Sequence, residues 1–307
     1  MRFYRRLFIA VGLVVSLLPG FVPTASADIN IGVMAPRGPL NAMKRWIEFG
    51  RYLTTELGDK VKITPLSPPN MVPVARVGSV DFTLSNPTMA VILQEVYGAK
   101  PLATLVKKTG SQFAGVIVAK KGKGIAKAED LKGKNVMALK FRRAAGAYTF
   151  QTYHLLQKGI NPHKDFATFK EGKRQDDLVL AVGKGEIDAA FVRSGLLESM
   201  QKEGKINIDD FVIVDQRSGD GLPQLHTTEL YPEWYLSALK GTDSDLADRV
   251  KAAALRLDAK SKAAKRAKII GFVEPLSMKS MKTALKALKI TPYDKDAADS
   301  SAVAAAK

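Results

Sequence analysis

Short apolar segments of strand type alternate with helical segments along most of this chain, and that alternation limits the fold more than any other feature. Residues 113–119 form a nearly continuous apolar run, and residues 187–192 form a second one. Between such runs, apolar side chains recur at helical spacing, as with Leu40, Met43 and Ile47. Strands alternating with helices at this spacing are typical of the α/β class with mostly parallel sheets.

Residues 1–27 have the pattern of a secretory signal peptide. Arg2, Arg5 and Arg6 precede an apolar run over residues 7–18, and residues 25–27 read Ala-Ser-Ala, which fits the cleavage pattern. The run is shorter than the ~20 residues that a membrane-spanning helix needs. We therefore predict export to the periplasm with cleavage after Ala27. Residues 294–307 are rich in Ala, Ser and Asp, and we expect this tail to be disordered.

The positive charge of the chain makes nucleic acid the first ligand to consider. The sequence holds 47 Lys+Arg against 30 Asp+Glu, a formal net charge of +17. In residues 246–268 the basic side chains alternate with alanines and have no aromatic neighbours, so stacking on bases is not supported. We interpret this segment as a solvated helix face, with docking on a partner or a membrane surface as the alternative. We expect no nucleic-acid ligand.

The residues that catalysis or metal binding would need are scarce. The chain has no cysteine, and its three histidines, His154, His163 and His226, are far apart in the sequence. It contains no P-loop, no nucleophile elbow and no zinc-protease motif. We therefore predict that the protein is not an enzyme and uses no metal and no cofactor, with an exported enzyme as a remote alternative.

Polar and positive residues recur where a predicted strand ends and a helix begins. In open α/β sheets ligands bind outside the carboxyl ends of the strands, and the free N–H groups of a helix N-terminus favour an anion. Arginine adds bidentate contacts to oxyanions, although a surface ion pair is the alternative for any single arginine. The candidate ligand-binding residues are Arg37, Asn86, Arg142, Arg143, Ala144, Ala145, Gly146, Tyr148 and Arg193.

The order and spacing of four segments give a family resemblance. These segments are residues 85–103 (Ser-Asn-Pro-Thr-Met-Ala-Val-Ile-Leu-Gln-Glu-Val-Tyr-Gly-Ala-Lys-Pro-Leu-Ala), 115–119 (Gly-Val-Ile-Val-Ala), 128–134 (Ala-Glu-Asp-Leu-Lys-Gly-Lys) and 185–190 (Gly-Glu-Ile-Asp-Ala-Ala). Together they resemble the periplasmic phosphate/phosphite/phosphonate-binding proteins of ABC importers, over nearly the whole mature chain.

A narrower resemblance lies in the second half of the chain. It is carried by residues 192–198 (Val-Arg-Ser-Gly-Leu-Leu-Glu), 230–235 (Leu-Tyr-Pro-Glu-Trp-Tyr), 271–275 (Gly-Phe-Val-Glu-Pro) and 292–293 (Pro-Tyr). These segments are similar to the branch that supplies sensory input to histidine kinases, which includes tetrathionate- and arsenite-type sensing systems.

The resemblance implies a type II periplasmic-binding-protein fold, with two α/β lobes joined by two crossing strands. We expect the crossings at residues 113–119 and 211–215, lobe one at residues 28–115 plus 215–293, and lobe two at residues 116–214. The implied function is capture of a small anion, a phosphonate- or phosphate-like oxyanion, for an ABC permease in the inner membrane. The alternative is a sensory partner of a membrane histidine kinase. We expect a monomer in either case.

One departure from the family pattern bears on the ligand. Phosphonate binders carry a Ser/Thr cluster before the helix near residue 145, but this chain has Arg142-Arg-Ala-Ala-Gly146 there and no hydroxyl before Tyr148. The sequence therefore leaves a different oxyanion or an organic anion as alternatives for the ligand. The lack of cysteine argues against a thiolate site for arsenite. By position, Asp188 matches the acidic residue of the family's G-x-x-D-A motif, with a structural role at the strand end as its alternative.

Overall fold

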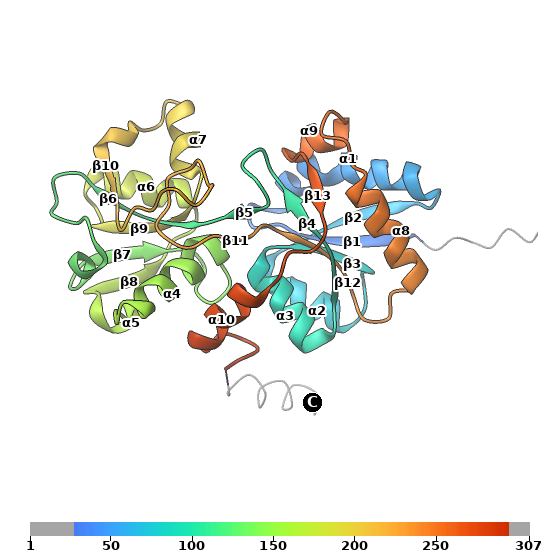
Figure 1. Ribbon diagram of the computed structural model, residues 1–307, viewed down its shortest axis with the longest axis horizontal. Helices are drawn as coiled ribbons and strands as arrows, with labels where there is room; N and C mark the ends of the chain where they lie inside the picture. The colour runs from blue at the N-terminus through green and yellow to red at the C-terminus, as the bar shows by residue number, and fades with distance from the viewer. Residues whose placement is uncertain (1–27, 295–307) are drawn as a thin grey trace, which may run out of the picture.

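The chain forms two α/β lobes that lie side by side (Figure 1). The computed structural model describes residues 28–294. The predicted signal peptide lies outside the described residues, as does all of the predicted tail except Asp294. The predicted two-lobe architecture is confirmed, and the lobes differ in size and strand order.

Lobe one is built on a mixed sheet with the strand order β13-β4-β12-β3-β1-β2. Neighbouring strands β1, β2 and β3 run parallel, whereas β12 runs antiparallel to both β3 and β4. The strands are β1 (Ile29–Met34), β2 (Val61–Leu66), β3 (Phe82–Ser85), β4 (Lys100–Val106), β12 (Tyr235–Ala238) and β13 (Gly271–Val273).

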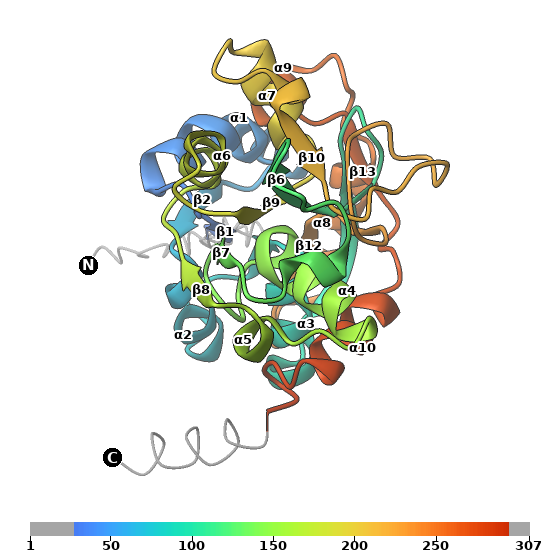
Figure 2. The same ribbon diagram turned by 90° about the vertical axis from the view of Figure 1, so that its left-hand side faces the viewer.

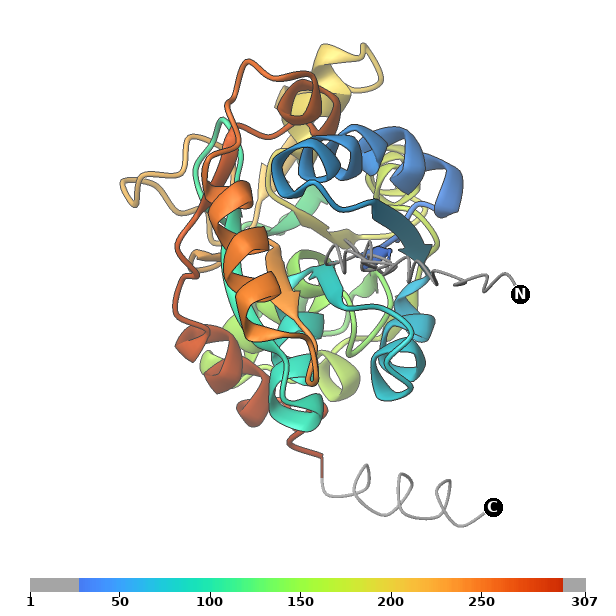
Figure 3. The ribbon, with the colours of Figure 1, turned by 90° about the vertical axis from the view of Figure 1, so that its right-hand side faces the viewer.

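Helices cover both faces of this sheet (Figure 3). Trp46, Phe49 and Leu53 of α1 pack with α8 and α9 on one face, and Met71 and Met89 help to bury the other face under α2 and α3. The helices are α1 (Pro39–Leu57), α2 (Met71–Arg76), α3 (Pro87–Tyr97), α8 (Ser244–Leu255), α9 (Lys262–Ala267) and α10 (Lys279–Ala287), with a short 3-10 turn η1 (Pro68–Asn70).

Local sequence sets the ends of the two helices that face lobe two. The Asn86 side chain accepts a hydrogen bond from the Met89 amide and caps α3, and Pro87 occupies its first turn. Helix α1 ends at Leu57 because Gly58 adopts a left-handed conformation with φ of 76°.

Lobe two is built on a second mixed sheet, with the strand order β10-β6-β9-β7-β8 (Figure 2). Strands β7, β8 and β9 are parallel, but β6 runs antiparallel to both of its neighbours, so this sheet is less parallel than the sequence pattern indicated. Helices on both faces explain why this strand is apolar throughout. The strands are β6 (Gly115–Lys120), β7 (Asn135–Ala138), β8 (Thr168–Glu171), β9 (Ala189–Arg193) and β10 (Phe211–Ile213).

The helices of lobe two include a short π-helical turn that opens the segment after β7. This turn, η3 (Ala145–Thr149), is kinked at Ala147, where φ of −139° is not helical, and it leads into α4. The remaining elements are α4 (Phe150–Gln157), α5 (Pro162–Asp165), α6 (Gln175–Lys184), α7 (Leu196–Lys202), η2 (Ala128–Leu131) and η4 (Ile208–Asp210).

A short antiparallel pair, β5 (Gln112–Phe113) with β11 (Tyr231–Pro232), connects the lobes (Figure 1). The outward crossing is therefore near Phe113, close to the predicted one. The return crossing is at Tyr231 and not at residues 211–215, because β10 pairs with β6 inside lobe two. Residues 215–230 consequently belong to lobe two, which corrects the predicted boundary.

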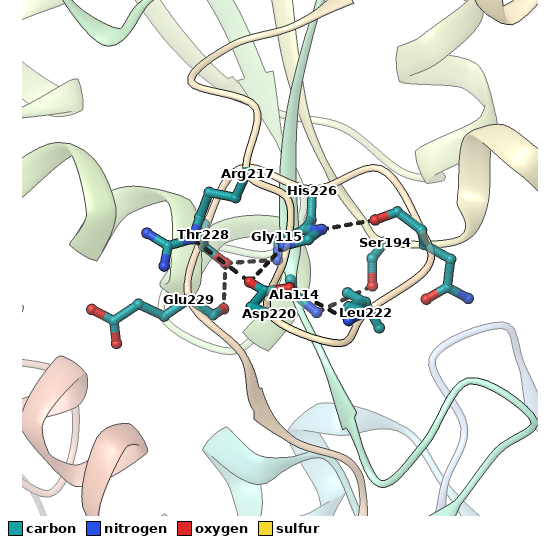
Figure 4. A network of polar contacts seen from close by, with 10 residues as sticks. Ala114, Gly115, Ser194, Arg217, Asp220, Leu222, His226, Thr228 and Glu229 are labelled. Carbon is teal, nitrogen blue, oxygen red and sulfur yellow. Dashed lines mark hydrogen bonds and ion pairs between the residues drawn. The ribbon is translucent and has the colours of Figure 1, made fainter.

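Residues 215–230 form a loop that is bonded to the start of β6 (Figure 4). The Gly115 amide donates to Thr228 Oγ1 at 2.9 Å, and the Ala114 amide donates to Ser194 Oγ at 3.1 Å. Within the loop, His226 Nε2 lies 2.9 Å from Asp220 Oδ2. These contacts fix the lobe-two side of the crossing.

The basic segment at residues 246–268 forms most of α8 and all of α9, and most of its alanines are buried in the core. Several of its charged side chains reach α1, as when Arg256 pairs with Glu56 at 3.0 Å and Lys262 with Glu48 at 3.2 Å. The predicted helix face is exposed, and some of its charged side chains form ion pairs that hold α8 and α9 against α1. Within residues 28–294, none of the helices combines the length and the apolar character that crossing a membrane requires.

Candidate functional site

The strand ends of the two lobes face each other where the lobes meet, and we call this boundary the cleft. In lobe one, the carboxyl ends of β1, β3 and β4 share an edge with the amino end of the antiparallel β12. In lobe two, the parallel strands β7, β8 and β9 end at the facing edge. Two contacts bridge the edges: Asn86 Nδ2 donates to the Arg143 carbonyl at 3.2 Å, and Arg37 lies 3.6 Å from Asp176.

An ion pair lies at the lobe-one edge of the cleft. Lys107 follows β4 and Glu233 precedes β12, and the two antiparallel neighbours bring their side chains together. The Glu233 side chain is 1% exposed and that of Lys107 is 17% exposed. The Lys107 ammonium also lies 5.8 Å from the centre of the Phe113 ring in the crossing strand.

Two arginines bring further positive charge to this ion pair. Burial and the nearby charge of Arg193 lower the pKa of Lys107 to about 8, although Glu233 opposes the change. Burial and Arg193 likewise lower the pKa of Arg45 to about 10. Arg193 of lobe two therefore lies within electrostatic reach of Arg45 and Lys107 of lobe one. We call Arg45, Lys107, Arg193 and Glu233 the cleft charge cluster.

Each arginine of the cluster is held by the protein through its backbone or its Nε group. Arg45 Nε donates to the Ala267 carbonyl at 2.8 Å, and its guanidinium lies 4.9 Å from the centre of the Trp46 ring. The Arg193 amide donates to Gln175 Oε1 at 2.7 Å, and its Nε donates to the Ser194 carbonyl at 3.1 Å. The two Nη groups of each guanidinium carry the donors suited to an oxyanion.

The π-helical turn η3 brings its backbone close to Arg193. A Cβ atom on Gly146 would lie 2.6 Å from the Phe113 ring and 3.4 Å from Arg193 Cβ, so only glycine fits there without a shift. Gln151 Nε2 donates to the carbonyls of Gly146, Val116 and Val192 and fastens the turn to the sheet. π-Helical turns are frequent at functional sites.

The predicted backbone donors of this turn are only partly available. The Ala144 amide donates to the Lys140 carbonyl at 2.9 Å, which removes it from the predicted set. Ala145 and Gly146 begin the turn, where helical amides have no acceptor within the helix. Opposite them, at the start of α3, Ser85 Oγ and Thr88 Oγ1 are buried with no hydrogen-bond partner among the described residues.

Two arginines predicted as ligand-binding do not join the cleft charge cluster. Arg142 donates to the Lys289 carbonyl at 2.7 Å and to Asp294 at 2.6 Å, and it adopts a left-handed φ of 64°. Its charge is therefore directed to the C-terminal segment. The Arg143 side chain is exposed, and only its carbonyl contacts lobe one, through Asn86.

Tyr148 and Asp188 also have partners inside lobe two. The Tyr148 hydroxyl lies 2.9 Å from His163 Nε2, and its ring packs on Phe141 and Phe169. Asp188 precedes β9 and accepts the Asn135 amide at 2.7 Å, which puts it at the opposite end of that strand from Arg193. The contact of Asp188 agrees with the structural alternative given for it, and the ligand-binding role of both residues stays a prediction.

Three members of the cleft charge cluster were not among the predicted residues. Lys107 directly follows β4, which ends at Val106, so the strand-end criterion could have found it. Glu233 lies in one of the segments that carried the family resemblance. Arg45 stands inside a helix, and no signal in the sequence separates it from other basic helix residues.

Comparison with known proteins identifies the family. Residues 31–279 match the family described as "ABC transporter, phosphonate, periplasmic substrate-binding protein". This chain belongs to that family.

The chain is also similar to part of a sensor histidine kinase. The chain is 34% identical over 227 residues to the tetrathionate sensor histidine kinase TtrS of Salmonella typhimurium, a match that covers 72% of this chain and 38% of the kinase. It thus spans well under half the length of that relative.

Solved structures share the fold at low identity. The PhnD1 protein of Prochlorococcus marinus, in complex with methylphosphonate, has a TM-score of 0.66 at 18% identity and covers 85% of this chain and 98% of its own. XAC2383 of Xanthomonas citri, bound to ATP, has a TM-score of 0.71 at 17% identity and covers 88% of this chain and 100% of its own.

Proposed function

We propose that this protein is a periplasmic solute-binding protein that captures a small oxyanion of the phosphate or phosphonate type for an ABC importer. The observation that carries the proposal is the cleft charge cluster, in which the buried Lys107–Glu233 ion pair lies within electrostatic reach of Arg45 and of Arg193 from the other lobe. Export rests on the signal-peptide pattern of residues 1–27. The protein would act as a monomer.

The physical argument is one of charge balance. Holding like charges together in a partly buried cleft costs free energy, as the lowered pKa values of Arg45 and Lys107 indicate. An anion between the lobes would offset that cost and would favour the closed arrangement, because it contacts both lobes at once. Arg193 and the amides of Ala145 and Gly146 would hold it from lobe two, and Arg45, Lys107, Arg37 and Asn86 from lobe one.

A sensory role is the second candidate. The sequence match to the kinase TtrS, at 34% identity, is well above the identities of the solved structures cited above. In that role the closed, ligand-bound protein would dock on a membrane histidine kinase. Affinity capture from membranes with the tagged protein, with and without phosphate, distinguishes the two roles. Retention of a permease indicates the transport role, and retention of a kinase indicates the sensory role.

We expect phosphate or a phosphonate to raise the melting temperature of the purified protein. A ligand at 100 times its dissociation constant adds ~2.7 kcal/mol of stability. For a protein of this size that corresponds to a rise of roughly 5–10 °C. Differential scanning fluorimetry against phosphate, phosphite, methylphosphonate, sulfate and neutral sugars measures it. A rise with a sugar and with none of the anions would contradict the proposal.

We also expect anion affinity to fall as the pH rises above about 8, where Lys107 loses its proton. A bound anion favours the charged ammonium, so binding takes up a proton at high pH, and the dissociation constant should rise by up to about tenfold per pH unit. Titration calorimetry with phosphate between about pH 7.5 and 9.5 measures the slope. The Lys107→Arg variant keeps its charge and should show a flatter profile. Equal slopes for both proteins would remove Lys107 from the site.

A further inference from the structure

We infer that a groove beside α10 is a docking site for an extended, acidic peptide segment of a partner protein. The groove lies between α3, the start of β4, residues of the segment 275–286 and Tyr293, and it has a volume of about 620 Å³. We call it the α10 groove. It shares no residue with the cleft charge cluster, so the inference concerns a surface that capture of an anion in the cleft does not use.

Three lysines of α10 supply the charge of the α10 groove. Lys279, Lys282 and Lys286 all line it, because residues three, four and seven positions apart share one face of a helix. Lys282 is paired with Glu95 of α3 at 2.7 Å. Lys279 and Lys286 are exposed, and neither forms an ion pair within residues 28–294. Of the described residues that line the groove, none is acidic. Two cations are therefore left for an anionic partner.

The separation of these two lysines favours an extended ligand over a compact one. Seven residues of α-helix, at 1.5 Å each, place the Cα atoms of Lys279 and Lys286 about 10 Å apart along the helix axis. An extended peptide advances about 3.3 Å per residue, so two carboxylates three residues apart have the same separation. A single phosphate group would have to draw the two ammonium groups together against their mutual repulsion.

The apolar part of the lining indicates a peptide in particular. Pro101, Pro275, Leu276 and Met278 line the groove together with the lysines. Exposed ion pairs are weak because water and salt screen them, so charge alone would not hold a hydrophilic anion tightly. A peptide adds apolar side chains between its carboxylates, and their burial against the prolines and Leu276 would stabilise the complex further. The groove is thus complementary to a segment that carries both acidic and apolar residues.

Helix α10 contacts both lobes, which relates the groove to lobe movement (Figure 1). It packs on α3 of lobe one and on α4 of lobe two. Before the helix, the Leu276 carbonyl accepts a hydrogen bond from the Tyr235 hydroxyl of lobe one at 2.9 Å. After it, the Lys289 carbonyl accepts one from Arg142 of lobe two at 2.7 Å. A movement between the lobes would therefore shift α10 relative to α3 and reshape the groove. We expect docking to depend on lobe closure, and this step rests on the proposed function.

Two labelled peptides of equal composition are the probes. In the first, glutamates stand three residues apart with leucine and alanine between them, and in the second the glutamates are adjacent. Fluorescence anisotropy at about 0.15 M salt, where exposed charges act over only about 8 Å, measures both dissociation constants. We expect the spaced peptide to bind at least about threefold more tightly. Equal affinities would contradict the match between peptide and lysines.

The double variant Lys279→Gln/Lys286→Gln tests the groove itself. It should weaken binding of the spaced peptide by about tenfold, as the loss of two exposed ion pairs implies. Lys260→Gln/Lys265→Gln is the control, because both lysines are exposed at α9, form no ion pair with the described residues and give the same charge change. It should stay within about twofold of the wild type. Equal losses in the two double variants would mean that the peptide follows the overall positive charge, and would overturn the inference.

Vesicles that contain an anionic phospholipid test a membrane as the other occupant. We expect the wild-type protein and Lys279→Gln/Lys286→Gln to bind them to the same extent in a sedimentation assay. Loss of vesicle binding in the variant, with neither peptide bound by the wild type, would assign the groove to a lipid surface and overturn the inference.

Phosphate separates this inference from the proposed function. Coupling between two ligands is reciprocal, so phosphate and the spaced peptide should tighten each other's binding by the same factor, about fivefold or more. The Lys279→Gln/Lys286→Gln protein should bind phosphate alone as the wild type does. Peptide affinity that does not respond to bound phosphate would contradict the coupling. Failure of phosphate and other anions to bind, with peptide binding intact, would contradict the proposed function and leave the docking site standing.

Discussion

Replacing Arg193 with glutamine is expected to raise the dissociation constant for phosphate by roughly 10- to 150-fold. Lobe two contributes Arg193 to the cleft charge cluster, and Arg193 is the last residue of β9. A hydrogen bond to a charged group is worth about 1.5–3 kcal/mol, and each 1.4 kcal/mol is about tenfold in affinity. Titration calorimetry at about pH 7.5 measures the loss.

The same variant should change Lys107. Because the charge of Arg193 lowers the pKa of Lys107, its removal should raise that pKa and move the alkaline loss of affinity to higher pH. A purely structural role for Arg193 would not shift the pH profile in this way. The second readout therefore ties the residue to the cluster.

Arg256→Gln is the matched control for Arg193→Gln. It makes the same charge change on α8, where the side chain is exposed and pairs with Glu56. It should leave phosphate affinity within about twofold, as expected for a distant, independent site. If Arg193→Gln bound phosphate as tightly as the control, the cleft charge cluster would not be the ligand site. Arg142→Gln, compared in the same series, tests the sequence-based hypothesis for the loop before η3.

The sequence predicted those parts of the structure that depend on neighbouring residues. The cap of α3 follows from Asn86 and Pro87, and the end of α1 follows from Gly58. Each of these signals acts within one helical turn. Arg193 was named as a candidate for a related reason. It ends a buried apolar strand, and the apolar run itself shows where that strand stops.

The other charges of the site could not be read in this way. Lys107 and Glu233 are 126 residues apart in the sequence, and they meet only because β12 lies beside β4. Strand order follows from the packing of the whole lobe, and no short segment encodes it. The contacts of Arg142 could not be read from the sequence for the same reason, since its partners Lys289 and Asp294 come from the far end of the chain.

The return crossing shows a further limit of predicting the fold from the spacing of apolar residues. Residues 211–214 have the apolar character of a strand, and the chain does form β10 there. The apolar pattern does not show which strand β10 pairs with. Because β10 pairs with β6 and not with a strand of lobe one, the chain stays in lobe two until Tyr231.

The largest expected effect on stability is at the crossing itself. Phe150 of α4 is fully buried, with its ring stacked on Tyr231 of β11 at 3.9 Å between centroids and 5.1 Å from Phe113 of β5. Phe150→Ala removes a ring that touches both crossing strands and leaves a cavity. We expect a loss of about 3–5 kcal/mol in the free energy of unfolding, measured as a lower urea midpoint.

Leu156→Ala is the control for this cavity, because Leu156 lies on the same helix but is 36% exposed. We expect it to cost no more than about 1 kcal/mol, since little apolar surface leaves a packed environment. Phosphate should still raise the midpoint of Phe150→Ala, because the ring contacts the crossing strands and not the cleft charge cluster. A loss in Phe150→Ala no larger than that of the control would mean that the crossing strands are held mainly by their backbone pairing and by the loop at residues 215–230.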